Sequence, residues 1–153
     1  MKRATEVAPE AARALLDVNV LIALLDADHM HHRPAVTWLS ANIDAGWASC
    51  AITQNACVRI MSQPGYPAAM PAAGVAARLR KATQSAHHRF VASTISLLDP
   101  ELFDTAQLLG PKQVTDVYLL GLAVSHGLRL VTFDGAISLR AIRSVTAGHL
   151  VSI

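Results

Sequence analysis

Hydrophobic residues along the chain gather in short continuous runs that alternate with longer segments in which they recur at helical spacing. The first run, Ala14 to Leu16, predicts the end of a buried strand. Asp17 follows at once, and from Asn19 the apolar residues continue to Leu25, over a length that suits a helix. The pattern therefore places a single carboxylate at a strand-to-helix turn inside a very hydrophobic stretch.

The same arrangement returns in the last third of the chain. Residues 115–126 are apolar at helical spacing, with Asp116 in the first turn, and Gly127 is the residue type that commonly ends such a helix. A strand is predicted over residues 128–133, and Asp134 follows it directly. A second carboxylate thus lies at the carboxyl end of a second apolar strand.

Between these two regions the pattern predicts a strand over residues 47–50 and helices over about 34–45, from 53 or 55 to 63, within 68–86 and over 100–109. A final edge strand is predicted over residues 150–153. Strands and helices therefore alternate, which is typical of the α/β class, with a mainly parallel sheet flanked by helices.

The length of 153 residues suits one domain with a full hydrophobic core. We expect residues 1–13, which are polar and Ala-rich, to be an N-terminal leader, and residues 14–153 to be the domain. No run approaches the roughly 20 apolar residues of a membrane span, and the leader lacks the apolar segment of a secretory signal. We therefore expect no membrane association and a cytoplasmic location.

The net charge and the cysteines exclude few classes of function. The formal net charge of +2 permits an anionic partner without requiring one, since dedicated nucleic-acid binders are usually far more basic. Cys50 and Cys57 do not form a metal-binding or redox pair, and the sequence has no other cysteine. We interpret both as reduced residues of the core.

The carboxylates are the candidate chemistry. If the strands before Asp17 and Asp134 are neighbours in a parallel sheet, the two side chains meet at one edge, where Asp116 can join them. Two carboxylates about 5 Å apart repel by roughly 3 kcal/mol at an effective dielectric constant of about 20. A cation would relieve this repulsion, and an all-oxygen donor set favours Mg²⁺ or Mn²⁺.

Two other interpretations of polar residues in the sequence compete with the metal site at the three acids. Asp17 could instead cap the helix that follows it by accepting a hydrogen bond from the backbone amide of Asn19 or Val20. The cluster of His29, His31 and His32 could suggest a metal site, but His31 and His32 are adjacent, and no spaced His or Cys completes a tetrahedral set. We therefore assign no metal to the histidines.

The resemblance to a known family rests on three segments, LLDVNVLIALLD, TQNACVRIMSQPGY and TDVYLLGLAVSHGLRLVTFD. Together they resemble a PIN domain, and specifically the VapC-type toxins of bacterial toxin–antitoxin pairs. The resemblance implies a three-layer α/β/α sandwich and a Mg²⁺- or Mn²⁺-dependent endoribonuclease whose catalytic, metal-binding acids are Asp17, Asp116 and Asp134. It also implies an RNA substrate, a small antitoxin protein as partner and a homodimer.

The same resemblance assigns supporting roles to five further residues. Asn19 matches the polar residue that supports the first acid, and Thr115 and Thr132 are expected to orient the acids by hydrogen bonds. Gln54 stands where the family usually has Glu, so we expect one metal ion to bind well and a second poorly. Arg59 could hold a substrate phosphate or pair with a carboxylate.

Other functions fit the sequence less well. A receiver-like phosphoacceptor domain needs a lysine after a late strand, and the lysines here are Lys2, Lys81 and Lys112. A dehalogenase-like phosphatase needs a second Asp at position 19, where the chain has Asn. The remaining alternative is a catalytically weakened PIN fold that serves as an RNA- or protein-binding module, motivated by Gln54. The sequence does not select an RNA target.

Overall fold

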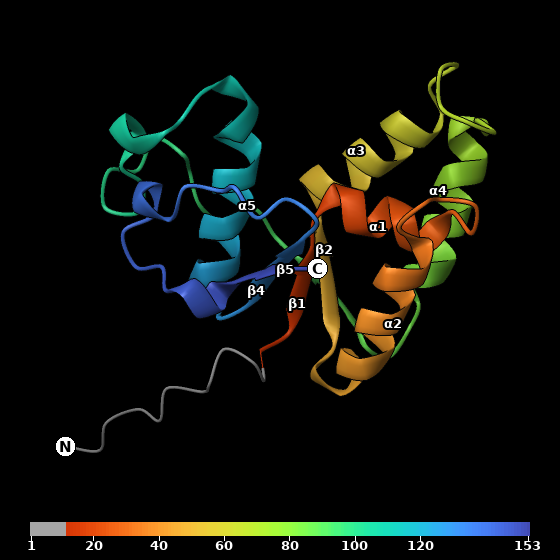
Figure 1. Ribbon diagram of the computed structural model, residues 1–153, viewed down its shortest axis with the longest axis horizontal. Coiled ribbons are helices and arrows are strands. Elements are labelled where there is room, and N and C mark those ends of the chain that lie inside the picture. Colours follow the sequence, from red (N-terminus) through yellow and green to blue (C-terminus); the bar gives the residue numbers. More distant parts are fainter. Residues whose placement is uncertain (1–11) are drawn as a thin grey trace.

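The computed structural model describes residues 12–153 (Figure 1). In this part of the chain the strands are β1 (Ala14–Leu16), β2 (Trp47–Cys50), β3 (His88–Val91), β4 (Arg129–Thr132) and β5 (Leu150–Ser152). They form one sheet in the order β3-β2-β1-β4-β5, and every neighbouring pair is parallel. The predicted parallel sheet is confirmed, with β1 at its centre and β5 at one edge.

The helices are α1 (Val18–Leu25), α2 (His32–Asn42), α3 (Ala51–Met61), α4 (Ala72–Thr83) and α5 (Val114–Ser125). Short 3-10 turns lie at Ile43–Ala45, Thr105–Gln107, Pro111–Gln113, Leu139–Ala141 and Ala147–His149. Gly127, two residues after the end of α5, has a φ of +67°, as expected of a glycine that ends a helix. No helix within residues 12–153 is long and apolar enough to cross a membrane.

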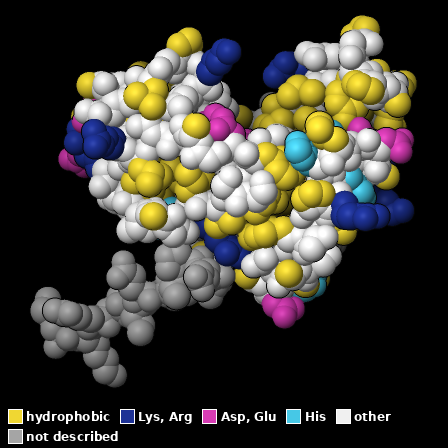
Figure 2. Space-filling model, viewed as in Figure 1, with side chains coloured by type: hydrophobic (Ala, Val, Ile, Leu, Met, Phe, Trp, Pro, Cys, Tyr) yellow, Lys and Arg dark blue, Asp and Glu magenta, His cyan; other side chains and the backbone are white. Residues whose placement is uncertain are grey.

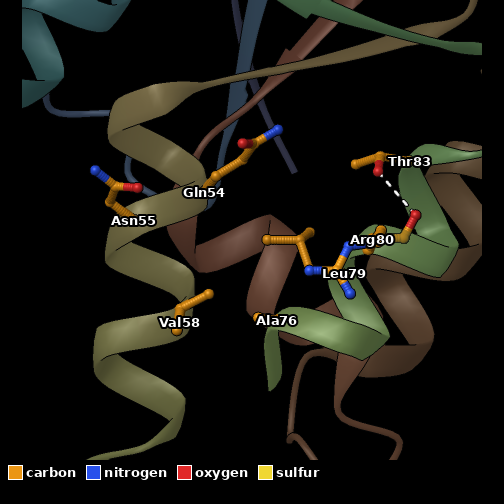
Figure 3. Close-up of a pocket in the computed structure, with 7 residues that line it drawn as sticks. All are labelled: Gln54, Asn55, Val58, Ala76, Leu79, Arg80 and Thr83. Carbon is orange, nitrogen blue, oxygen red and sulfur yellow. Dashed lines mark hydrogen bonds between the residues drawn. The ribbon is translucent and has the colours of Figure 1, made fainter. Parts of the chain in front are cut away.

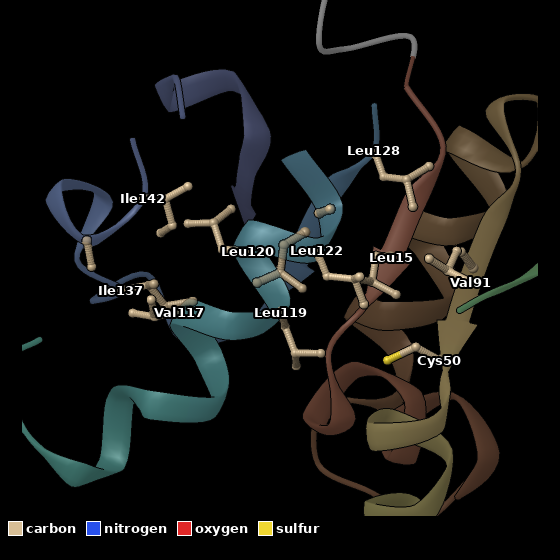
Figure 4. Close-up of a cluster of buried hydrophobic side chains, with 14 of the residues drawn as sticks. Leu15, Cys50, Val91, Val117, Leu119, Leu120, Leu122, Leu128, Ile137 and Ile142 are labelled. Carbon is tan, nitrogen blue, oxygen red and sulfur yellow. The ribbon is translucent and has the colours of Figure 1, made fainter. Parts of the chain in front are cut away.

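Helices cover both faces of the sheet, which makes three layers (Figure 1). Successive side chains of a strand point to opposite faces, so Leu15 packs into the cluster on the α5 side with Leu119 and Leu122 (Figure 4). Leu16 packs into the second cluster, which α1, α2, α3 and α4 share. Burial on both faces explains why the β1 sequence is apolar without alternation. The expected three-layer α/β/α sandwich is confirmed.

The two cysteines divide between these clusters. Cys50 lies on the α5 side and Cys57 on the other, and both are fully buried and free. Burial raises the pKa of the Cys57 thiol to about 11, so this thiol stays protonated and unreactive at neutral pH. Both cysteines are core residues, as interpreted from the sequence.

The beginning of the chain is only partly described. Most of the expected leader, residues 1–11, lies outside the described residues. Arg13 is bonded to the sheet region: its guanidinium donates to the His87 carbonyl at 2.7 Å, and its own carbonyl accepts from the Arg129 amide at 3.1 Å. The last residues of the predicted leader are therefore held by the fold.

The helix predicted over residues 100–109 is wrong. This segment forms turns and a 3-10 turn, and Phe103 makes an isolated antiparallel bridge to Ile142. Asp99 and Asp104 each accept a hydrogen bond from the backbone amide two residues further on. Such side-chain turns compete with helical hydrogen bonds and hold the segment in its irregular path.

Candidate active site

The pairing of β1 with β4 sets the geometry of the site. Leu16 is opposite Val131 in this parallel pair, and the Asp17 amide donates to the Val131 carbonyl at 2.9 Å. Asp17 follows β1 directly and Asp134 comes two residues after the end of β4, so both lie at the carboxyl edge of neighbouring strands. This is the edge at which open parallel sheets bind their ligands.

A cavity of about 380 Å³ opens at this edge, and we call it the acid cavity. It is lined by Asp17, Asp116, Asp134, Asn19, Val18, Ile22, His29, Ile60 and Tyr66. The three acids predicted from the sequence and the predicted Asn19 therefore share one cavity. In the space-filling view the surface is hollowed between α5 and α3, with acidic side chains beside the hollow and hydrophobic ones over α3 (Figure 2).

Thr132 connects the polar residues of the site. Its buried hydroxyl donates to Asp17 Oδ2 at 2.7 Å, and it accepts from the Asp134 amide at 3.0 Å and from Asn19 Nδ2 at 3.3 Å. The hydroxyl uses its one donor and both its acceptor positions in these three bonds. The expected hydrogen bond from Thr132 to an acid is therefore present, and Asn19 reaches Asp17 through Thr132.

Asp17 also caps α1. Its Oδ1 accepts from the Val18 amide at 2.7 Å while Oδ2 accepts from Thr132. The cap is therefore present, but its donor is the Val18 amide and not the expected amide of Asn19 or Val20. Capping does not exclude a role in the site, because each carboxylate oxygen has one of these partners. Two fixed bonds hold this buried carboxylate in one orientation.

The electrostatics of the acid cavity disfavour ionised carboxyl groups. Burial raises the pKa of Asp17, an effect that the Thr132 and Val18 hydrogen bonds oppose and that the charge of Asp134 reinforces. The pKa of half-buried Asp116 is raised to about 6, first by burial and then by the charges of Asp17 and Asp134. Neighbouring carboxylates therefore raise the pKa of both Asp17 and Asp116, and added positive charge would favour the ionised forms of these two acids.

This pKa shift predicts a pH dependence of stability in the metal-free protein. Between pH 3.8 and about 6, Asp116 holds a proton in the folded state that it releases on unfolding, so its contribution to stability falls as the pH rises. Asp116→Asn should therefore gain thermal stability relative to wild type across this window. Thermal melts in EDTA at several pH values measure it, and a difference that is equal at every pH would contradict the assignment.

The donor set of the acid cavity fits a hydrated divalent ion. Its acidic side chains offer oxygen donors, and no Lys or Arg of the described chain lines it. Within residues 12–153 no group of three or more His, Cys, Asp or Glu side chains is arranged to hold a metal ion by itself, so an ion bound here would need waters or substrate oxygens as further ligands. Mg²⁺ and Mn²⁺ keep several waters and need only one or two carboxylates, whereas a structural zinc site needs a closed set.

The structure does not bring Gln54 to the acids. The Gln54 amide donates to Ser49 Oγ at 2.9 Å, and Ser49 Oγ also contacts His88 Nε2 at 2.8 Å. Gln54 lines a separate cavity of about 280 Å³ between α3 and α4, together with Asn55 (Figure 3). The rotation of α3 explains the difference, because Ile60 is the residue of this helix that lines the acid cavity.

Two other expected residues also lie away from the acid cavity. Arg59 is exposed on the last turn of α3, and Thr115 is exposed in the first turn of α5. Neither lines the acid cavity. Their expected roles in binding phosphate and in orienting the acids therefore gain no support from the geometry.

Sequence reasoning missed His29 and Tyr66, which both line the acid cavity. Tyr66 lies in the loop after α3, and its hydroxyl donates to the Asp26 carboxylate at the end of α1. His29 lies in the turn between α1 and α2. The His-rich turn was visible in the sequence, but its position beside the acids depends on tertiary contacts.

The sequence of residues 14–142 matches the family model of the PIN domain. This match covers most of the chain, and the chain belongs to the PIN domain family. Within that family it is similar to the VapC ribonucleases. Ribonuclease VapC44 of Mycobacterium tuberculosis (strain ATCC 25618 / H37Rv) is 51% identical over 141 residues, which cover 92% of this chain and 99% of VapC44. The resemblance stated from the sequence is confirmed.

Two solved structures share the fold. VapC20 of Mycobacterium tuberculosis, a sarcin-ricin loop cleaving toxin, has a TM-score of 0.57 at 17% identity and covers 86% of this chain and 98% of its own. VapBC2 of Rickettsia felis, bound to a DNA fragment from its promoter, has a TM-score of 0.51 at 13% identity and covers 79% and 87%. At these identities the likeness concerns the fold alone.

Proposed function

We propose that this protein is an endoribonuclease that hydrolyses RNA phosphodiester bonds with Mg²⁺ or Mn²⁺, and that it is the toxin component of a type II toxin–antitoxin system. The observation that supports the proposal is the acid cavity at the carboxyl edge of β1 and β4, which Asp17, Asp134 and, from α5, Asp116 all line. The similarity to VapC ribonucleases over nearly the whole chain supports the same chemistry. We assign this activity to a domain of residues 14–153.

The three acids would hold the ion. Such an ion neutralises phosphate charge and makes an attacking water more acidic. The chain's own residues supply its placement: Thr132 and the Val18 amide fix the Asp17 carboxylate, and the Thr132 hydroxyl also accepts from the backbone of Asp134. This preorganisation means that the donors need little rearrangement when substrate arrives.

The alternative of a weakened fold that only binds RNA or protein loses its motivation. This alternative assumes that Gln54 lies beside the acids and lacks the charge that a Glu would add there. In the structure Gln54 donates a hydrogen bond to Ser49 and lines another cavity. The expectation of one metal ion that binds well and a second that binds poorly stays a prediction, because three carboxylates line the acid cavity and Gln54 adds no charge to it. We therefore retain the nuclease as the proposed function.

A purified-protein assay tests the activity. Cleavage of total RNA should be absent in EDTA and restored by added Mg²⁺ or Mn²⁺, because the acids need a cation to bring a phosphate into their cavity. Equal cleavage with and without EDTA would contradict the metal dependence. No cleavage under any of these conditions would contradict the nuclease itself.

We also propose an antitoxin protein and a homodimer as partners. The similarity to VapC proteins and the shared fold with VapBC2 support an antitoxin partner. Co-expression with the neighbouring open reading frame, followed by affinity purification and mass measurement of the complex, tests both. Recovery of free monomer alone would count against them.

A further inference from the structure

The acid cavity is also lined by residues that have no carboxylate. Val18, Ile22 and Ile60 contribute apolar surface to it, and Tyr66 and His29 contribute rings. We call Tyr66 and His29 together the aromatic wall. A cavity that combines carboxylates with such a wall has room for two chemically different parts of one ligand.

Tyr66 is held in place by Asp26. Its hydroxyl donates to Asp26 Oδ2, and its backbone amide donates to the Gln63 carbonyl at 2.9 Å. That side-chain bond is the main reason why the pKa of Asp26 is lowered, so the partner of Tyr66 is an ionised carboxylate at neutral pH. The hydroxyl is therefore already bonded, and the ring itself contributes to the lining of the cavity.

His29 has a defined tautomer in this arrangement. Its Nδ1 accepts from the His31 amide at 3.1 Å, which leaves the ring proton on Nε2 as a donor. The His29 ring lies 5.7 Å from the His31 ring, which in turn lies 4.7 Å from the ring of Phe133. The wall therefore offers one flat aromatic ring and one hydrogen-bond donor.

We propose that the aromatic wall binds a nucleobase of the RNA substrate beside the scissile phosphate, with the base stacked on Tyr66 and a base acceptor bonded to His29. Asp26 then acts as a positioning residue through its bond to Tyr66. The inference rests on the proposed function, because it places the scissile phosphate at the three acids of the same cavity.

Three observations favour a base over a phosphate or a protein side chain. The ionised Asp26 carboxylate, which accepts from the Tyr66 hydroxyl, repels a second phosphate. A donor beside an aromatic ring suits a flat group with polar edges better than an aliphatic side chain. The wall also lines the cavity of the acids, so a nucleotide bound there needs no separate groove.

The experiment uses an end-labelled RNA oligonucleotide that carries a cleavage site mapped in total RNA. An abasic ribose replaces each nucleotide near the cut in turn, and every substrate is cleaved by wild type and by Tyr66→Leu. Stacking of one base on an aromatic ring corresponds to a factor of about 5 to 150 in kcat/KM. We expect the kcat/KM of wild type to fall by this factor for one abasic position, mostly through a higher KM. The kcat/KM of Tyr66→Leu should already be lower by the same factor with intact RNA, and the abasic substitution at that position should not lower it further.

Matched variants separate stacking from general damage. Phe90→Leu replaces an exposed ring on β3, away from the acid cavity, and should leave cleavage unchanged. Tyr66→Phe keeps the ring but loses the hydrogen bond to Asp26, so it should raise KM about as much as Asp26→Ala does. The double variant Tyr66→Phe with Asp26→Ala should raise KM no further than either single variant. Manganese titration should give the same affinity for Tyr66→Leu as for wild type.

Three results would overturn the inference while leaving the nuclease intact: unchanged cleavage by Tyr66→Leu, an equal loss for every abasic position in both proteins, or reduced manganese affinity in Tyr66→Leu. Unchanged RNA cleavage with weaker inhibition by co-purified antitoxin would assign the wall to a protein partner instead. If wild type cleaves no RNA in Mg²⁺ or Mn²⁺, the proposed function fails, and this inference fails with it.

Discussion

Replacing Asp17 with Asn is expected to abolish RNA cleavage and leave the protein folded. Asp17 is the most buried of the three acids, and both its oxygens are held by fixed hydrogen bonds. The amide has a similar shape but no charge, so the cation loses its best-positioned ligand. We expect activity to fall by about 100-fold or more, as when a preorganised electrostatic group is removed from an active site.

The fold should tolerate this change because folding disfavours the Asp17 charge. The pKa of Asp17 is raised, so its contribution to stability is present at low pH and is lost as the pH rises through the folded-state pKa. The amide can accept only one of the two hydrogen bonds that the carboxylate accepts, and this loss opposes the gain from removing the buried charge. At neutral pH in EDTA the Asn variant should therefore melt close to wild type, and manganese should stabilise it less.

Asp44→Asn is the matched control, since Asp44 is exposed in the 3-10 turn after α2 and lies outside the acid cavity. It should cleave RNA and bind manganese as wild type does. Cleavage by Asp17→Asn at the wild-type rate would show that the acid cavity is not the site of hydrolysis.

Replacing Thr132 with Val should reduce both stability and activity. The buried hydroxyl donates to Asp17 and accepts from Asn19 and from the Asp134 amide, and Val removes all three bonds without changing the shape much. Leaving buried polar partners unsatisfied costs about 1–3 kcal/mol of unfolding free energy. Loss of a residue that orients a metal ligand costs about 10- to 100-fold in metal affinity or activity.

Urea unfolding and RNA cleavage measure the two effects of Thr132→Val separately. Thr132→Ser keeps the hydroxyl and removes only a methyl group, so it should retain most of the activity and of the stability. If Val and Ser behave alike, the hydrogen bonds of the hydroxyl do not orient the acids.

The acids could be predicted from the sequence because their positions depend on local pattern. A run of apolar residues that ends in Asp identifies a strand end, and the parallel order of the sheet then brings Asp17 and Asp134 to one edge. Asp116 follows from its place in the first turn of α5. These inferences need only the spacing of hydrophobic residues in each strand and helix and the parallel direction of neighbouring strands.

The position of Gln54 depends on the rotation of a helix, and the position of Tyr66, which the sequence did not indicate, depends on the path of a loop. Whether Gln54 reaches the acids is decided by how α3 turns about its axis when Cys57 and Met61 pack into the core. The spacing of residues in α3 does not fix that angle relative to β1. Tyr66 meets Asp26 across 40 residues through a loop whose path is set by tertiary contacts.

The central position of β1 has a consequence for the order of events during folding. β1 pairs with β4, so the hydrogen bond between Asp17 and Thr132 joins residues that are 115 positions apart in the sequence. Contacts between residues so far apart in the sequence form slowly during folding. The chain through α4 contains only Asp17 of the three acids and lacks β4, which pairs with β1. The acid cavity therefore cannot form until the last third of the chain has been made and has joined the sheet.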